Sequence, residues 1–174
     1  KEYPVEQYLR DSKIASIYEG ANGIQSMDLM GRKMRVSDGA PYKAFMAEIE
    51  GFLRANTDNT VIGEEIRDLG VVVKRLGDMA AKMGDMMSSD PLQWASYTYP
   101  ALLCFGDVAI CWRLLDMAIA AQKAMDRAGK NDFYRGKIMQ ATYYAGVTLP
   151  LAMARLETCL RKGREVVDMP DEAF

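Results

Sequence analysis

The sequence of 174 residues contains no histidine. This absence excludes Ser-His and Cys-His nucleophile pairs, histidine metal ligands and the usual proton shuttle near neutral pH. Any acid–base chemistry of this chain must therefore fall to glutamate, aspartate, lysine or tyrosine.

Cysteine is also scarce. Cys104, Cys111 and Cys159 are an odd number set in apolar helical sequence, with no CxxC spacing and no secretory segment ahead of them. Cys104 and Cys111 stand two helical turns apart on one face, and we favour two small core residues over a thiol pair. The pattern predicts a reducing, cytoplasmic compartment and no catalytic thiol.

Neither a charge excess nor a long apolar run is present. The 22 lysines and arginines nearly balance the 24 aspartates and glutamates, for a net charge of -2, so no overall field attracts nucleic acid or an anionic membrane. The apolar stretch from Tyr99 to Trp112 is cut by Asp107 and Arg113, well short of the ~20 residues that a membrane span needs. We therefore expect no nucleic-acid partner and no membrane span.

The period-two alternation of strands is missing throughout, whereas helical spacing recurs along the whole chain. The sequence therefore predicts an all-α fold, with two short N-terminal helices followed by an up-down bundle of about four long helices. The expected helices span residues 5–18, 24–36, 42–54, 62–87, 91–128 and 133–164.

The fourth expected helix carries the most regular apolar pattern, in alternating steps of four and three residues. The repeat comprises Ile62, Ile66, Leu69, Val73, Leu76, Ala80, Met83 and Met87. Such a seam is typical of a helix bundle, although a coiled-coil partner helix could use the same stripe. Because several other helices are available, we favour an internal bundle, with the methionines at 79, 83, 86 and 87 as adaptable filler rather than a cofactor site.

Proline marks the last two long helices. Asp90 followed by Pro91 is a helix N-cap followed by proline at the first helical position. Pro100 and Pro150 lie inside the two helical patterns that follow, where we expect an interruption and a kink. Because a short turn separates these two helices, they are expected to pack as an antiparallel pair.

A turn cluster, Ser37-Asp38-Gly39-Ala40-Pro41, predicts the boundary between residues 1–36 and a helical-bundle domain of residues 37–174. Ahead of it, the helix expected over residues 5–18 spreads its apolar side chains over more than one face. We expect that helix to need neighbours outside this chain. The sequence also opens at Lys1 without an initiator methionine, so the true N-terminus is expected upstream.

The stretch that points to chemistry is Ile17-Tyr18-Glu19-Gly20-Ala21-Asn22-Gly23-Ile24-Gln25. It places a carboxylate on a glycine-flanked break between two helical patterns, where the backbone can approach a ligand closely. Taken alone, Glu19 reads as an ordinary acidic residue at a helix end.

Its surroundings change that interpretation. The segments Tyr3–Asp11, Ile17–Gly20 and Ile24–Gln25, about the first fifth of the chain, closely resemble the last two helices of the catalytic C-terminal bundle in acyl-CoA dehydrogenases. The continuation Met27–Lys33, followed by a long helical remainder, resembles the large subgroup with an appended helical C-terminal domain. The (methylmercapto)propionyl-CoA dehydrogenases are examples of that subgroup.

The resemblance implies a reaction and its partners. Glu19 would take a proton from the α-carbon of an acyl-CoA thioester while a β-hydride moves to the flavin of FAD, and an electron-transfer flavoprotein would accept the electrons. The resemblance also implies a homo-oligomer. Since the resemblance places residues 1–36 at the end of a catalytic domain, the isolated chain is expected to be inactive and not to hold FAD tightly.

The same resemblance assigns roles around the base. Tyr18 and Gly20 would border the substrate, with a simple core position as the alternative for Tyr18. Ala21, Gly23 and Gln25 occupy positions that commonly face the dinucleotide. Ala21 stands where the family usually has threonine, and Gly23 where a longer polar residue is common, so these two positions leave mainly backbone contacts.

Two readings therefore remain. One is the C-terminal part of an FAD-dependent acyl-CoA dehydrogenase, and the other is a stand-alone helical module for interaction or oligomerisation without catalysis. Arg10 and Asp11 lie within the matching stretch, but we expect them to be an exposed pair of charges on a helix.

Overall fold

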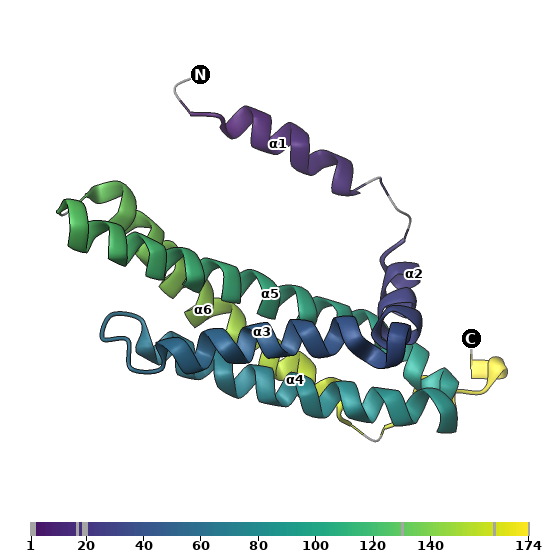
Figure 1. Cartoon of the computed structure of the whole chain (residues 1–174). Coiled ribbons are helices and arrows are strands. Elements are labelled where there is room, and N and C mark those ends of the chain that lie inside the picture. The colour runs from purple at the N-terminus through teal and green to yellow at the C-terminus, as the bar shows by residue number, and fades with distance from the viewer. Residues whose placement is uncertain (1–2, 17, 19–20, 130, 162, 174) are drawn as a thin grey trace.

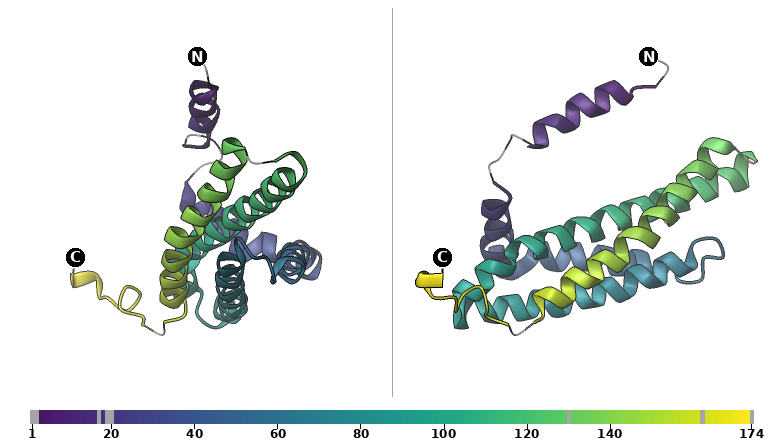
Figure 2. Two further views of the ribbon diagram at one scale, coloured as in Figure 1. Left: turned by 90° about the vertical axis from the view of Figure 1, so that its left-hand side faces the viewer. Right: turned by 180° about the vertical axis from the view of Figure 1, so that it is seen from behind.

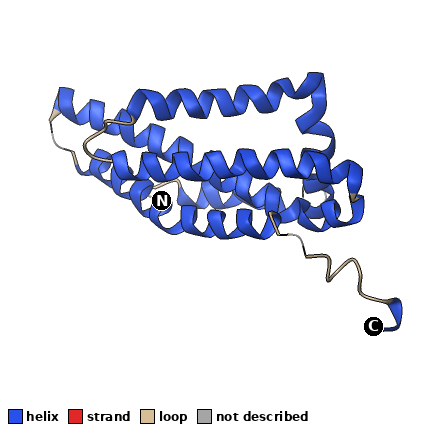
Figure 3. Ribbon diagram, turned by 90° about the horizontal axis from the view of Figure 1, so that it is seen from below, coloured by secondary structure: helices blue, strands red, loops and turns tan. Residues whose placement is uncertain are grey.

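The computed structural model describes residues 3–16, 18, 21–129, 131–161 and 163–173. Within these residues every regular element is helical, as Figure 3 shows, which confirms the all-α fold. Four long helices form the bundle. They are α3 (Ala40–Asn56), α4 (Gly63–Ser89), α5 (Pro91–Ala128) and α6 (Asp132–Cys159).

The N-terminal part is more broken. It contains α1 (Val5–Lys13), η1 (Ile14–Ser16), α2 (Asn22–Met27), η2 (Asp28–Arg32) and η3 (Lys33–Gly39), and a last short turn, η4 (Asp171–Ala173), ends the chain. Figure 1 shows α1 standing apart from the bundle, while α2 sits against one end of α5. The helix expected over residues 5–18 thus ends its α-helical part at Lys13.

The seam of α4 faces the interior. Ile66, Leu69 and Leu76 are essentially inaccessible to solvent, and the repeat residues between 62 and 83 are all buried. Met79, Met83 and Met86 belong to the same core. The internal bundle is therefore confirmed, and the methionines fill its core.

Helices α5 and α6 run antiparallel along most of their lengths, as the two views of Figure 2 show. The Cys104 Sγ lies 3.7 Å from the Ala152 carbonyl oxygen, and the Cys159 Sγ lies 3.9 Å from that of Tyr97. These crossed contacts confirm the expected antiparallel pair.

The two internal prolines do not divide their helices. Helix α5 continues through Pro100 and α6 through Pro150, so the expected interruptions are wrong. A proline removes one backbone donor from the helix. Each helix has buried residues on both sides of its proline, and the expected kink at each proline stays a prediction.

Side chains cap the first turns of both of these helices, at Asp90 as the sequence predicts and also at Asn131. Asp90 accepts a hydrogen bond from the Gln93 N–H at 3.3 Å, with Pro91 next to it, and Asn131 accepts one from the Phe133 N–H at 2.8 Å. The C-terminal tail then returns to the start of α5, where the Gln93 amide donates to the Gly163 carbonyl at 2.7 Å.

One expected helix is wrong in detail. Residues 24–36 do not form a single α-helix, because α2 gives way at Asp28 to a π-helical turn and then to a tighter 3-10 turn. The segment ends in a reversal of the chain, with Ser37, Asp38 and Gly39 at φ values of 50°, 56° and 78°. Glycine adopts such a backbone without strain, which explains its place in the turn cluster. A domain boundary at this reversal stays a prediction.

Among the helices that the structure describes, none combines the length and the apolarity required to cross a bilayer.

Candidate functional site

The predicted catalytic turn lies between η1 and α2. Ile17, Glu19 and Gly20, which include the predicted base and one predicted substrate contact, fall outside the described residues. Tyr18 is described, and its side chain is 64% exposed. A core position for Tyr18 within this chain is therefore wrong, because no buried surface of the bundle covers the ring.

The predicted cofactor residues begin α2. Ala21 is exposed and extended, at φ -70° and ψ 143°, and its carbonyl accepts the first hydrogen bonds of the helix, from Ile24 and Gln25. A Cβ placed on Gly23 would meet no atom within 4 Å, and Gln25 is half-buried. Ala21 and Gly23 therefore leave this stretch of backbone exposed, which is compatible with a dinucleotide that contacts the backbone.

A buried polar contact fixes α2 to the bundle. The Ser26 hydroxyl lies 3.0 Å from that of Thr98 on α5, and both side chains are almost fully buried. Ser26 also contacts the Gly23 carbonyl oxygen at 2.8 Å, and Thr98 that of Ala95 at 3.0 Å. Because each hydroxyl carries one proton, two of the three contacts are hydrogen bonds at any moment.

The next turn packs against an indole ring. A Cβ on Gly31 would lie 3.4 Å from the Trp94 ring, an ordinary van der Waals distance, so the π-helical turn packs directly against this ring of α5. Among the described side chains, the Trp94 Nε1 has no hydrogen-bond partner. Sequence reasoning missed both anchors, although serine and threonine in otherwise apolar helical patterns are a signal for a buried polar pair.

Charges gather on the solvent side of the same turn. Arg32 holds Asp28 at 2.5 Å and 3.1 Å, and this hydrogen bond lowers the pKa of the Asp28 carboxyl. The Lys33 Nζ is farther away, at 4.0 Å. Asp28 is therefore engaged mainly by Arg32.

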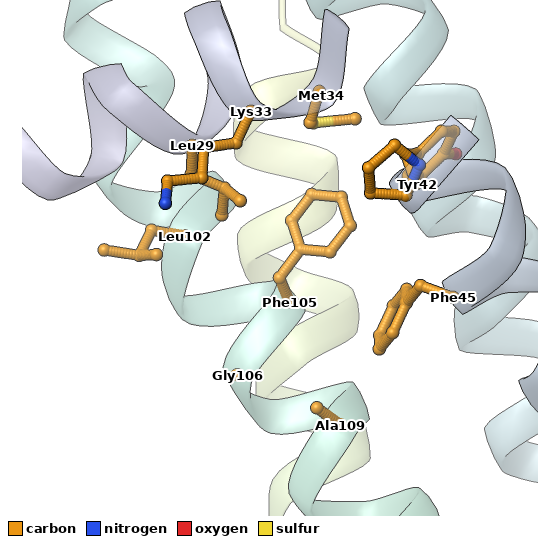
Figure 4. A pocket seen from close by; sticks show the side chains of 10 residues that line it. Leu29, Lys33, Met34, Tyr42, Phe45, Leu102, Phe105, Gly106 and Ala109 are labelled. Atoms are coloured by element: carbon orange, nitrogen blue, oxygen red, sulfur yellow. The ribbon is translucent and has the colours of Figure 1, made fainter. Parts of the chain in front are cut away.

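An apolar groove lies beside these residues. It has a volume of about 420 Å³ and is shown in Figure 4. Three segments line it: Leu29, Lys33 and Met34 from η2 and η3; Pro41, Tyr42 and Phe45 from α3; and Leu102, Phe105, Gly106 and Ala109 from α5. The predicted site residues that the structure describes, namely Tyr18, Ala21, Gly23 and Gln25, do not belong to its lining.

The three cysteines are core residues, as expected. All are fully buried and reduced, and burial raises the pKa of Cys104 and Cys111 to about 12 and that of Cys159 to about 11. The part of the chain that the structure covers holds no group of three acidic or thiol side chains placed to ligate a metal.

Arg10 and Asp11 are exposed on α1, as expected. They pair along the helix rather than with each other, since Arg10 contacts Glu6 at 2.5 Å and Asp11 accepts from Gln7 at 2.7 Å.

With this geometry in place, similarity to known proteins settles the family. The family model described as "Acetyl-CoA dehydrogenase C-terminal like" matches residues 45–170, which include most of α3 and all of α4, α5 and α6. The chain belongs to this family. The resemblance to acyl-CoA dehydrogenases with an appended helical domain is thereby confirmed.

Individual relatives agree with the family. A broad-specificity linear acyl-CoA dehydrogenase, FadE5 of Mycobacterium tuberculosis, is 29% identical over 185 residues, covering 100% of this chain and 30% of the relative. A butyryl-CoA dehydrogenase of Syntrophomonas wolfei is 29% identical, over 100% of this chain and 29% of the relative. A 3-methylmercaptopropionyl-CoA dehydrogenase of Ruegeria pomeroyi is 29% identical, over 83% of this chain and 25% of its own length. The chain thus spans less than a third of each.

Proposed function

We propose that this chain is the C-terminal part of an FAD-dependent acyl-CoA dehydrogenase, with Glu19 as the base that removes the α-proton of an acyl-CoA thioester. The family match over residues 45–170 carries the proposal, and relatives that align over 100% of this chain extend the similarity to the part that holds the Tyr-Glu-Gly turn. The names of the relatives, all acyl-CoA dehydrogenases, support the substrate class.

Glu19 needs a dry environment to act as a base. A carboxylate in water is too weak a base for a carbon acid, and desolvation raises its pKa toward a useful value. The described neighbours on either side, Tyr18 and Ala21, are exposed. We infer that the bound thioester and parts of the parent protein outside the described residues supply the desolvation, and that Tyr18 then covers the carboxylate.

The remaining roles follow the chain order. Gly20 would allow the thioester to lie against the backbone, and Ala21, Gly23 and Gln25 would line the dinucleotide. When bound, FAD supplies the acceptor for the β-hydride. The open space at Gly23 supports contact through the backbone, and Gln25 offers an amide that can both donate and accept.

The chain is proposed to be inactive by itself. It spans about 30% of the length of its relatives, and its exposed turn has no enclosure among the described residues. A preparation of these 174 residues should therefore be colourless and should not oxidise acyl-CoA. A yellow, active preparation would contradict this proposal.

The decisive experiment is Glu19→Gln in the full-length parent. Glutamine keeps the shape of the side chain but cannot take a proton, so we expect kcat to fall by at least about 10³-fold while FAD stays bound. Glu6→Gln makes the same chemical change at an exposed site on α1 that pairs only with Arg10 among the described contacts, and should leave kcat unchanged. Near-normal turnover of Glu19→Gln would remove the base assignment.

The proposed partners extend from the same reaction. An electron-transfer flavoprotein is proposed to reoxidise the flavin, the parent is proposed to be a cytoplasmic homo-oligomer, and the helical bundle to contribute to its subunit contacts. The alternative, a stand-alone interaction module, requires a start codon close to Lys1. Reading the gene upstream of Lys1 separates the two, because the dehydrogenase requires several further domains there.

A further inference from the structure

The groove between η2–η3, α3 and α5 has the features of a binding site for a small molecule. Its volume of about 420 Å³ is within the usual range of ligand sites, and such sites are mainly apolar with few polar groups. We propose that this groove binds a single-chain anionic amphiphile, a linear aliphatic carboxylate whose chain fills the groove and whose anion pairs with Lys33.

Aromatic contacts hold one wall of the groove in place. Phe45 of α3 and Phe105 of α5 lie with their ring centres 6.2 Å apart, and Tyr42 meets Phe105 edge-on at 6.2 Å. Behind them, Phe45 meets Trp112 edge-on at the same distance. Such pairs stabilise one arrangement of the rings. The groove is therefore formed before a ligand arrives, which lowers the entropic cost of binding.

A glycine leaves room along the α5 side of the groove. Gly106 lies in the middle of α5, where glycine is unfavourable for a helix, and a Cβ on it would meet no atom within 4 Å. No close packing of helices therefore requires a glycine here. Instead, the missing side chain widens a groove whose other α5 residues are Leu102, Phe105 and Ala109.

Among the described residues that line the groove, Lys33 alone is charged. Its side chain is 62% exposed, and Figure 4 shows its nitrogen at the edge of the groove, next to Leu29 and Leu102. Asp28 makes its short contacts to Arg32, so the distant Lys33 ammonium keeps the capacity to pair with an anion. An apolar groove with one cation at its edge is complementary to a chain with one terminal anion.

This proposal does not depend on the dehydrogenase function. Of the described residues in the predicted catalytic and cofactor stretch, 18 and 21–25, none lines the groove, and binding can be measured without flavin or turnover. Decanoate, used below its micelle concentration, is a suitable probe for the full 174-residue chain, with uncharged decanol as its partner. Isothermal titration calorimetry should show saturable binding of one decanoate per chain. Tryptophan fluorescence should also change, because Trp112 contacts Phe45, which lines the groove.

Gly106→Leu tests the location of the site. An added Cβ meets no atom within 4 Å, and the rest of the leucine side chain should occupy groove volume, so decanoate and decanol binding should be lost while the melting temperature is kept or raised. Gly146→Leu is the matched control, because Gly146 is also inside a long helix, also has no atom within 4 Å of an added Cβ, and does not line the groove. It should bind decanoate like the unmodified chain.

Lys33→Met tests the charge. It keeps an apolar side chain of similar length, so decanoate should bind about two- to five-fold more weakly, as expected for one exposed ion pair, while decanol binding stays unchanged. The control Lys123→Met changes an exposed lysine that does not line the groove, and should have no effect.

Three outcomes would overturn the proposal. They are the absence of saturable binding, binding that survives Gly106→Leu, and an equal effect of Lys33→Met on decanoate and decanol. The remaining possible occupant of the groove is a second copy of the chain, and sedimentation of the unliganded chain tests for it. Self-association that Gly106→Leu abolishes and Gly146→Leu does not would assign the groove to a second copy of the chain instead.

Discussion

At the scale of single residues, the three thiols show how burial replaces reactivity. Cys104, Cys111 and Cys159 are in apolar surroundings, where the neutral thiol is favoured over the thiolate. Since the thiolate is the nucleophile, the folded chain should react with a thiol reagent such as DTNB far more slowly than a free cysteine does at about pH 8.

All three thiols should react rapidly in denaturant. This control shows that both the reagent and the thiols are able to react. Fast reaction of even one thiol in the native chain would contradict its placement in the core.

The same thiols predict a loss of stability at high pH. The folded pKa of Cys104 and Cys111, about 12, lies above the ordinary 9.0, so between these values the unfolded chain gives up protons that the folded chain keeps. Deprotonation then favours unfolding. The free energy of unfolding, measured by urea titration, should therefore be unaffected by these thiols below about pH 9 and fall as the pH rises toward 12.

Replacing Cys104 and Cys111 by alanine should reduce that fall. An equally steep alkaline loss in the alanine variant would assign it to other groups, such as the tyrosines.

At the scale of elements, α2 is a short helix that depends on its contact with α5. It has six residues, no side-chain cap within its described surroundings, and the buried Ser26–Thr98 contact. Isolated helices of this length are unstable in water. The orientation of α2, and of the turn ahead of it, therefore depends on packing against the bundle.

Thr98→Val should loosen that packing. Valine has the shape of threonine but leaves Ser26 with one contact fewer, at an expected cost of about 1 kcal/mol in the free energy of unfolding. Amide hydrogen exchange in α2 should become faster. Thr158→Val is the matched control, since its hydroxyl contacts only the Ala154 carbonyl of its own helix. Unchanged exchange in α2 would mean that apolar contacts alone hold it.

The helices also show which structural features the sequence could predict and which it could not. The four long helices follow from periodicity and caps, and the start of α5 at Pro91 is predicted correctly because Asp90 and the proline act locally. The π-helical turn could not be predicted, because it depends on Gly31 meeting Trp94 across the fold. The same limit applies to Ser26 and Thr98, which are 72 residues apart in the sequence.

The candidate catalytic turn could be predicted from the sequence for a different reason. The Tyr-Glu-Gly turn was found through resemblance to a family, whereas its described neighbours Tyr18, Ala21 and Gly23 form no enclosed pocket with the bundle. The groove could not be found in this way, because its lining comes from three segments that only the fold brings together.

At the scale of the whole molecule, the chain contains a bundle whose core is formed by its own helices, and an N-terminal helix, α1, that does not pack against this bundle. Every residue of α1 is exposed, including Val5, Tyr8 and Leu9 at 66%, 65% and 69%. An apolar surface of this kind indicates a partner surface elsewhere. It agrees with the expectation that this helix needs neighbours beyond the chain.

This division predicts the effect of two deletions. The described side chains of residues 3–15 are all exposed, so removing residues 1–16 should change the free energy of unfolding by less than about 0.5 kcal/mol, and dye binding by ANS should decrease. Removing residues 1–39 also strips Met30, Ser26 and Gly31 from the bundle. That deletion uncovers Trp94 and Thr98, so it should lower stability by several kcal/mol and increase ANS binding.

Equal stability of the two shortened chains would show that the bundle needs nothing ahead of α3, whereas a large loss from the shorter deletion would mean that α1 packs on the bundle.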